Sequence, residues 1–194
     1  MRISSLLLIA VAALAACRRA PQAPADAAPV QEVVAGVPMI DFTSPEARFS
    51  CRAPRDWGMR EKLVEKKNGA TFVGEAAPRG SALVHISIRR YPESEPGRVD
   101  ARTYAESFWE IDPARKQPDI ATERVGGATV LRFHQERPYY KGHSRKPEYM
   151  NRYDYALIPV PGGFFEIEHR ARAEEYKATL PVFEAVVRSF KPAP

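Results

Sequence analysis

The chain has 194 residues, with 29 Lys and Arg against 24 Asp and Glu, which gives a formal net charge of +5. That modest excess falls well short of the concentrated basic charge of nucleic-acid-binding proteins, so we expect no nucleic acid partner, whereas anionic lipid or polysaccharide fits the charge. Two cysteines are too few for a disulfide framework, and a chain of this length can bury a core without one.

The N-terminal segment has the pattern of an export signal. Arg2 is followed over residues 3–13 by apolar or small side chains, interrupted only by Ser4 and Ser5, and the run ends at Cys17. A membrane-spanning helix needs roughly 20 apolar residues. An apolar stretch of about ten residues is instead typical of a cleavable signal peptide.

Residues Leu14 to Cys17 read Leu-Ala-Ala-Cys and match the bacterial lipobox. Small alanines fit a narrow peptidase cleft, and only a thiol can form the thioether to diacylglycerol. We therefore expect residues 1–16 to be a lipoprotein signal peptide and Cys17 to carry the lipid that anchors the chain to a membrane. The alternative is an ordinary secretory signal that happens to precede a cysteine. Because Arg18, and not an aspartate, follows Cys17, we expect the outer membrane, with the protein facing the periplasm.

Residues 17–38 are predicted to be the lipidated cysteine and a Pro/Ala-rich linker, since they contain few large apolar side chains and their prolines stiffen the chain. These prolines are Pro21, Pro24, Pro29 and Pro38. The linker would space a single domain, predicted over residues 39–194, away from the bilayer. Val33, Val34 and Val37 could still pack on that domain.

The predicted domain begins with strands. One is expected over residues 49–53, followed by Trp57 in a turn with a buried indole. The pair Asn68-Gly69 is a strong hairpin signal and precedes another apolar run. Residues 82–91 alternate between polar and apolar side chains. The members of this strand expected to face a core are Val84, Ile86 and Ile88.

Helices are expected in two places. Residues 100–111 have apolar side chains at helical spacing, and Asp100 can cap their N-terminus. Residues 174–190 carry an apolar stripe of Tyr176, Leu180, Phe183, Val187 and Phe190. Because Pro181 interrupts this segment, we expect Thr179 to cap the main helix and the preceding turn to be separate or kinked.

Two hairpins are expected between these helices. Their strands are predicted over residues 120–125 and 128–134, and over residues 150–160 and 164–172. Glycine pairs separate the members of each hairpin. Consecutive hairpins with an internal and a closing helix describe an α+β domain with an antiparallel sheet.

Four segments add a further signal, namely Phe49–Pro54 leading to Trp57, Val125–Ala128, Pro161–Ile167 and Pro181–Pro192. Together they resemble the PsbP-like family, whose fold also occurs in a Ran-binding nuclear-import factor. The resemblance covers the chain from Phe49 to Pro192. It implies an αβα sandwich around a central antiparallel sheet, closed by the C-terminal helix, and it brings no catalytic residues.

The most distinctive stretch of the domain is basic and aromatic and lies between two predicted strands, over Arg137–Arg152. Its cations outnumber its one acid, Glu148, and tyrosines are interleaved. Loops on rigid scaffolds often carry binding residues, and such side chains can hold an anionic glycan, a lipid headgroup or an envelope protein. We expect a long hairpin loop, and the alternative is a solvated loop without a partner. The candidate binding residues are Arg137, Tyr139, Tyr140, Lys141, Arg145, Lys146, Tyr149 and Arg152.

The histidines form no close pair, although His85, His134 and His169 lie on predicted strands and could converge on a metal ion. No familiar catalytic or phosphate-binding motif is present, so we predict no catalytic residues, no metal site and no cofactor.

Three further side chains are given structural roles. Glu166 and Glu168 share a strand face with Arg170 and are expected to form an exposed charged row. Cys51 is left without a partner if Cys17 carries lipid, and we predict a half-buried structural thiol.

The sequence therefore favours an envelope-anchored lipoprotein that acts without catalysis, as a binding or assembly module. One alternative is a metal-binding protein that uses the strand histidines. Another is a periplasmic carrier of a small apolar ligand, which requires a cavity between sheet and helix. A hydrolase is the most distant alternative.

Overall fold

The computed structural model describes residues 30–44, 48–66, 69–79, 81, 83–93, 99–107, 119–143 and 145–193. These residues form two antiparallel sheets. The smaller sheet has the order β1 (Val30–Val34), β2 (Val37–Ser44), β3 (Phe49–Pro54) and β11 (Lys191–Pro192). The larger sheet has the order β4 (Trp57–Lys66), β5 (Gly69–Pro78), β6 (His85–Pro92), β10 (Gly163–Arg172), β9 (Tyr149–Val160), β8 (Ala128–Tyr139) and β7 (Ala121–Val125).

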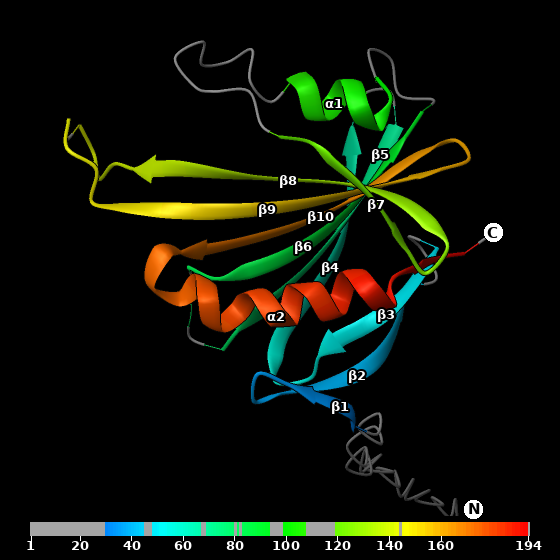
Figure 1. Cartoon of the computed structure of the whole chain (residues 1–194), viewed down its shortest axis with the longest axis horizontal. Helices are drawn as coiled ribbons and strands as arrows, with labels where there is room; N and C mark the ends of the chain where they lie inside the picture. The colour runs from blue at the N-terminus through cyan, green and yellow to red at the C-terminus, as the bar shows by residue number, and fades with distance from the viewer. Residues whose placement is uncertain are drawn as a thin grey trace, which may run out of the picture.

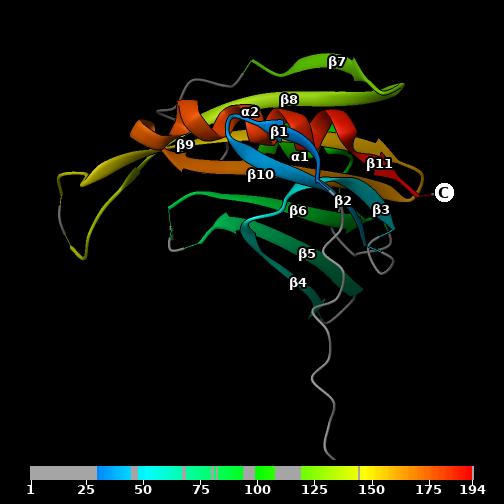
Figure 2. The ribbon, with the colours of Figure 1, turned by 90° about the horizontal axis from the view of Figure 1, so that it is seen from below.

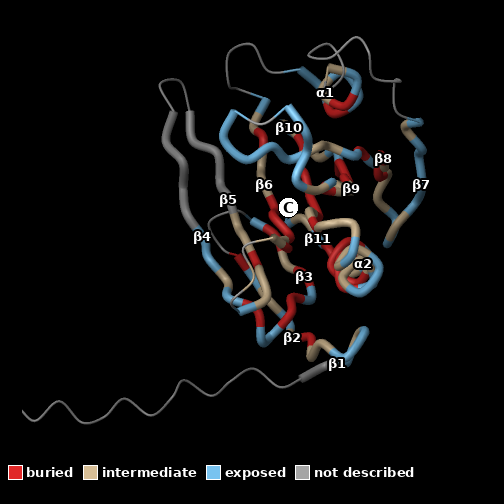
Figure 3. Tube along the Cα trace, turned by 90° about the vertical axis from the view of Figure 1, so that its left-hand side faces the viewer, coloured by how far each residue is buried: buried red, intermediate tan, exposed pale blue. Residues whose placement is uncertain are grey.

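Two helices cover opposite faces of the larger sheet (Figures 1 and 3). The short α1 (Ala101–Ser107) covers part of one face, and the longer α2 (Ala173–Ser189) covers the other. Helix α2 also contacts β3 and β1, and Phe49 of β3 contacts Phe165 of β10, so α2 and the smaller sheet lie side by side on the same face of the larger sheet (Figure 3). The predicted α+β fold with an αβα arrangement and a closing helix is confirmed. The smaller sheet was not predicted.

Strand β10 occupies the middle of the larger sheet, where both of its faces are buried. Phe165 and Ile167 point toward α2, whereas Phe164 and Glu166 point toward α1, and each of the four is at most 2% exposed. Successive side chains of a strand alternate between faces, so a strand buried on both sides has no solvated positions until it leaves the core. Any polar side chain of β10 in this region must therefore find its hydrogen-bond or ion-pair partners inside the protein.

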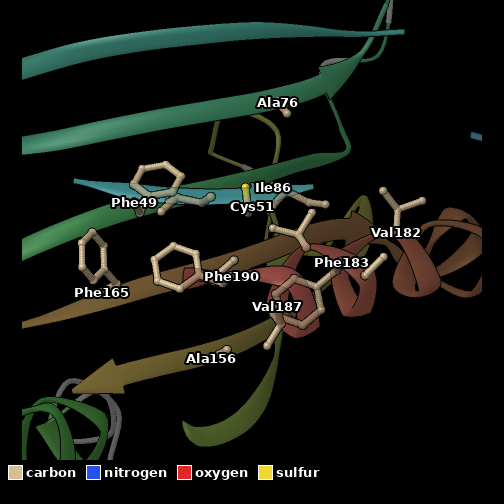
Figure 4. Close-up of a cluster of buried hydrophobic side chains, with 14 of the residues drawn as sticks. Phe49, Cys51, Ala76, Ile86, Ala156, Phe165, Val182, Phe183, Val187 and Phe190 are labelled. Atoms are coloured by element: carbon tan, nitrogen blue, oxygen red, sulfur yellow. The ribbon is translucent and has the colours of Figure 1, made fainter. Parts of the chain in front are cut away.

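Three aromatic rings join the two sheets to α2 (Figure 4). Phe49 of β3 stacks on Phe190, the residue after α2, with 5.2 Å between ring centroids. Phe165 of β10 meets both rings edge-on, at 5.9 Å and 5.1 Å. Large apolar rings in offset or edge-on geometry contribute strongly to core stability. Phe183, Val187 and Phe190 of the predicted helical stripe are all buried.

Most predicted elements are confirmed. Asp100 caps α1, since its Oδ1 accepts hydrogen bonds from the backbone N–H groups of Arg102 and Thr103 at 2.8 Å and 3.0 Å. The hairpins β7–β8 and β9–β10 pair as expected. Val84, Ile86 and Ile88 are buried. The signal peptide, Cys17, the Asn68 turn position and the end of the first predicted helix lie outside the described residues.

The predicted linker boundary is wrong. The segment 30–38 is not linker, because β1, the turn at Ala35 and Gly36 with φ values of +47° and +78°, and the first two residues of β2 occupy it. Val34 and Val37 pack against the core and Met39 is fully buried, whereas Val33 is 63% exposed and does not pack as predicted. The apolar alternation of this hairpin outweighs the Pro/Ala composition that suggested a linker.

Two other predicted details differ. Trp57 is buried, as expected, but it is the first residue of β4 and does not stand in the turn. Helix α2 runs without a break through Pro181, so Thr179 does not cap it; the Thr179 hydroxyl instead donates to the Glu175 carbonyl at 3.1 Å. An interior proline costs about 3 kcal/mol in a helix. Burial of the residues that follow Pro181, from Val182 to Val187, offsets this cost.

The turn between β9 and β10 places a glycine where no side chain fits. Gly163 has a φ of +141°, and a Cβ built there would lie 2.0 Å from the carbonyl oxygen of Tyr91 on β6. The neighbouring Gly162 has a φ of +76°, with no atom within 4 Å of the equivalent position. We expect Gly163→Ala to lower the free energy of unfolding by at least about 3 kcal/mol, because backbone must move.

Gly162→Ala is the matched control, since it adds only the left-handed backbone strain of about 1 kcal/mol. Urea unfolding of both variants measures the difference. Equal stability losses for the two variants would show that β10 does not approach β6 as closely as described.

Candidate functional site

The hairpin of β8 and β9 projects beyond the rest of the larger sheet (Figure 1). We call its outer part, residues 137–152, the arm. Strand pairing continues outward to Tyr139 and Tyr149, which corrects the predicted long loop: the two strands extend into both of its ends, and only residues 140–148 lie between them. Arg137, Tyr139, Tyr149 and Arg152 therefore lie on strands.

One face of the arm carries cations stacked on aromatic rings. Tyr139 and Tyr149 stack with 4.6 Å between centroids, and the guanidinium of Arg172 lies 3.9 Å from the Tyr149 centroid. Nearer the sheet, the Arg137 guanidinium lies 5.0 Å from the Tyr153 ring. Such cation–π contacts hold long side chains in fixed positions. The arm is thus built as an ordered surface.

The tip of the arm collects the remaining predicted residues. Tyr139 and Tyr140 are 43% and 45% exposed, and Met150 beside them is 36% exposed. Lys141, Arg145 and Lys146 are exposed at the same end. The structure thus places seven of the eight predicted binding residues on this face or at the tip of the arm, and the cationic and aromatic groups of the tip face solvent.

Arg152 is the exception. It lies on the opposite face of the hairpin, where its Nε pairs with Glu136 at 2.8 Å and its guanidinium lies 5.2 Å from the Tyr176 ring of α2. Successive side chains of a strand point to opposite faces, so Arg152 points away from the face on which Tyr153 lies. Arg152 ties the base of the arm to α2.

The predicted exposed row of Glu166 and Glu168 is wrong, since these side chains are 0% and 8% exposed. The Tyr104 hydroxyl of α1 donates to Glu166 Oε2 at 2.8 Å, and Arg89 Nη1 donates to Oε1 at 3.2 Å. Burial, together with the charge of Glu168, raises the pKa of Glu166 from its ordinary value of 4.5 to about 7. Alternation within β10 alone could not reveal this, because α1 is what covers that face.

Glu168 behaves in the opposite way. Burial would raise its pKa, but a hydrogen bond with His85 Nε2 at 3.2 Å and the charge of Arg89 outweigh that effect, so the pKa lies below its usual value. Neighbouring carboxylates on one strand thus carry different charge near neutral pH. Both are held by their partners in the core and neither lines an opening described for the protein.

The three strand histidines do not converge. His85 faces the α1 side, whereas His169 lies on the α2 side, fully buried, with Nδ1 3.3 Å from Asp154 and Nε2 2.9 Å from Thr179 Oγ1. His134 is exposed. Among the described residues, no group of three or more His, Cys, Asp and Glu side chains is arranged to bind a metal ion. His169 serves to fasten α2 to the sheet.

Cys51 is more buried than predicted, at 5% exposed, and it has no disulfide partner. Burial and the charge of Glu61 raise the pKa of its thiol to about 12, so the reactive thiolate is suppressed. It lines an apolar cavity between the sheets with a volume of about 30 Å³. That is far below the several hundred Å³ of a small-molecule site.

Comparison with protein-family models gave no match, and comparison with curated proteins gave none either. Solved structures do match. Cyanobacterial PsbP (CyanoP) from Synechocystis sp. PCC 6803 aligns with a TM-score of 0.50 and 10% identity, over 79% of this chain and 92% of its own. The chain has the PsbP-like fold, as the resemblance of its sequence predicted.

Two other structures align less closely. A protein from Bacteroides thetaiotaomicron VPI-5482 has a TM-score of 0.47 and 12% identity over 79% of this chain, which spans only 48% of that protein. LpqN, involved in cell envelope biogenesis of Mycobacterium tuberculosis, has a TM-score of 0.42 and 11% identity over 80% of this chain and 91% of its own. None of the three names describes a catalytic activity.

Neither helix in the described part of the chain combines the length and hydrophobicity that crossing a bilayer requires.

The raised pKa of Glu166 predicts a pH-dependent stability. The folded state holds the proton more tightly than the unfolded chain, so the stabilisation is complete below pH 4.5 and is lost as pH rises through about 7. We expect this loss to be on the order of 3 kcal/mol. Glu166→Gln cannot ionise and should remove it.

Urea unfolding at a series of pH values measures this effect, with the exposed Glu148→Gln as the control that keeps the native pH dependence. The same slope for Glu166→Gln and the native protein over that pH range would contradict a buried, proton-retaining Glu166.

Proposed function

We propose that this protein is a lipid-anchored, non-enzymatic binding module of the bacterial cell envelope, and that the arm contacts its anionic partner. The observation that carries the proposal is the convergence of exposed cations and tyrosines on one projecting hairpin. Lys141, Arg145 and Lys146 supply positive charge, and Tyr140 supplies exposed aromatic surface. Anionic glycans, lipid headgroups and acidic protein surfaces offer the complementary charge.

The construction of the arm supports a binding role. Contact surfaces are strongest where rigid aromatic and arginine side chains need little ordering on association. The Tyr139–Tyr149 stack and the Arg172 guanidinium over Tyr149 give that order before a partner arrives. Arg152 adds a second attachment through Glu136 and Tyr176. Charged groups at the tip then add orientation and speed of encounter.

The lipobox supplies the proposed location. Lipid on Cys17 would hold the protein at the membrane, since each buried methylene contributes about 0.8 kcal/mol and several chains anchor stably. Residues 18–29 lie between Cys17 and β1. If extended, a segment of that length reaches about 40 Å. The arm would therefore search a layer close to the membrane, and we place it at the periplasmic face of the outer membrane.

The alternatives receive less support. A metal-binding role lacks a suitable group of side chains among the described residues. A carrier of a small apolar ligand needs far more room than the 30 Å³ cavity beside Cys51.

Neutralising the tip tests the arm. We expect the triple variant Lys141→Gln, Arg145→Gln and Lys146→Gln to lose most of the crosslinked envelope partner, because three cations near an anionic surface contribute roughly 1 kcal/mol each. The measurement is crosslinking and pull-down of the full-length lipidated protein from its own envelope, at low and high salt.

A control triple variant, Arg124→Gln, Lys177→Gln and Arg188→Gln, removes equal charge from exposed positions elsewhere. It should retain the native partners. If the tip variant still captures every partner that the native protein captures, the arm is not the contact surface.

Lipidation is tested separately. Cys17→Ser should move the protein from the membrane fraction to the soluble fraction and abolish labelling by a radioactive fatty acid. Cys51→Ser is the matched control, because that thiol is buried. Retention of the label in Cys17→Ser would disprove the proposed anchor.

A further inference from the structure

A second surface feature lies beside the arm and is independent of it. Strands β4, β5 and β6 make up one end of the larger sheet (Figure 2). Residues of these strands, together with Arg79 and with Arg170 of β10, line an open hollow with a volume of about 500 Å³. Its basic lining comprises Arg60, Arg79, His85 and Arg170. The volume lies in the range of small-molecule sites.

The three arginines reach the hollow from separate parts of the chain. Arg60 is on β4, Arg79 follows β5, and Arg170 is near the end of β10. None of them forms an ion pair with another residue in the described ranges. Three guanidinium groups outnumber the one lining carboxylate, Glu75, so an anion in the hollow would relieve their mutual repulsion.

The acidic side chains nearby do not cancel this charge. Glu75 lines the hollow opposite Arg60 in the strand register, yet no ion pair joins the two. Glu168 does not line the hollow, but its carboxylate, which bonds to His85 at 3.2 Å, also interacts with the charge of Arg170. Three guanidinium groups against these two carboxylates still leave the hollow positive.

We propose that this hollow binds a phosphate group. Arginine presents a planar fork of donors that matches phosphate oxygens bidentately, and three arginines in one lining suit a group with several equivalent oxygens. Two sources share this chemistry in an envelope: the headgroup of a phospholipid, and a free phosphate-bearing metabolite or inorganic phosphate. Arg170 pairs in register with Tyr153 at the base of the arm, so a headgroup bound here would sit beside the arm.

The test is titration of the full-length protein in detergent with inorganic phosphate at low salt, followed by isothermal calorimetry. The double variant Arg60→Gln and Arg170→Gln should weaken phosphate binding at least tenfold, because it removes two charge-assisted donors. The double variant Arg124→Gln and Arg188→Gln removes the same charge from distant exposed positions and should bind as the native protein does. Thermal unfolding of both variants confirms that they are folded.

A second set of measurements distinguishes the two sources of the phosphate group. Vesicles of phosphatidylglycerol and of phosphatidylcholine are compared for binding to the same four proteins, with the arm-tip triple variant as the fourth. Loss of phosphatidylglycerol binding in the Arg60/Arg170 variant assigns a lipid headgroup, whereas loss of only inorganic phosphate binding assigns a soluble ligand. Either result supports the proposal, and neither depends on whether the arm binds its own partner.

Two results overturn the proposal. One is the absence of phosphate binding to the native protein at about 10 mM ligand, beyond the weakest affinity of a functional site. The other is an equal loss of binding in the Arg124/Arg188 variant, which would show that net charge alone attracts phosphate.

Discussion

The structure depends on one constraint, the burial of β10 on both faces. Its α2 face is apolar except for His169, but its α1 face carries Glu166 and Glu168 into the core. An isolated buried carboxylate is costly, so it must be protonated, paired or hydrogen-bonded. Glu166 meets this requirement with Tyr104 and Arg89, and Glu168 with His85. The two buried glutamates therefore determine which partner side chains β6 and α1 must supply.

The two helices are consequently held by different physics. Helix α2 buries a continuous apolar surface that includes Phe183 and Val187, and this burial is non-directional. Helix α1 has only seven residues, and its link to the core includes the Tyr104 hydroxyl on a carboxylate. Directional bonds of this kind fix orientation more than they add stability. Where β10 extends beyond α1, the side chains on that face turn from core to surface, and Arg170 and Arg172 face the hollow and the arm.

The sequence predicted the regular elements well because periodicity reports burial directly, as in the alternation of β6 and the stripe of α2. It failed where burial depends on partners distant in the chain. Nothing near Glu166 in sequence indicates that α1 covers it, and the register with Arg89 exists only once β6 and β10 pair. The arm lies between these two cases. Its composition identified the candidate residues, but only strand pairing could show that Arg152 faces away from the other seven. The hollow joins three arginines from distant elements, so no local pattern contains it.

Burying acids also changes the electrostatics of the surface. The formal net charge of +5 counts Glu166 and Glu168 as though they faced solvent, yet both are withdrawn into the core, and the raised pKa of Glu166, about 7, keeps part of its population protonated at neutral pH. The field outside the protein is set by exposed charges, and it is screened over about 8 Å at physiological salt. At the arm tip, the exposed cations Lys141, Arg145 and Lys146 outnumber the one exposed acid, Glu148. Charge arranged in this way speeds the encounter with an anionic surface and orients the domain, whereas the ordered tyrosines supply the contact area that retains it.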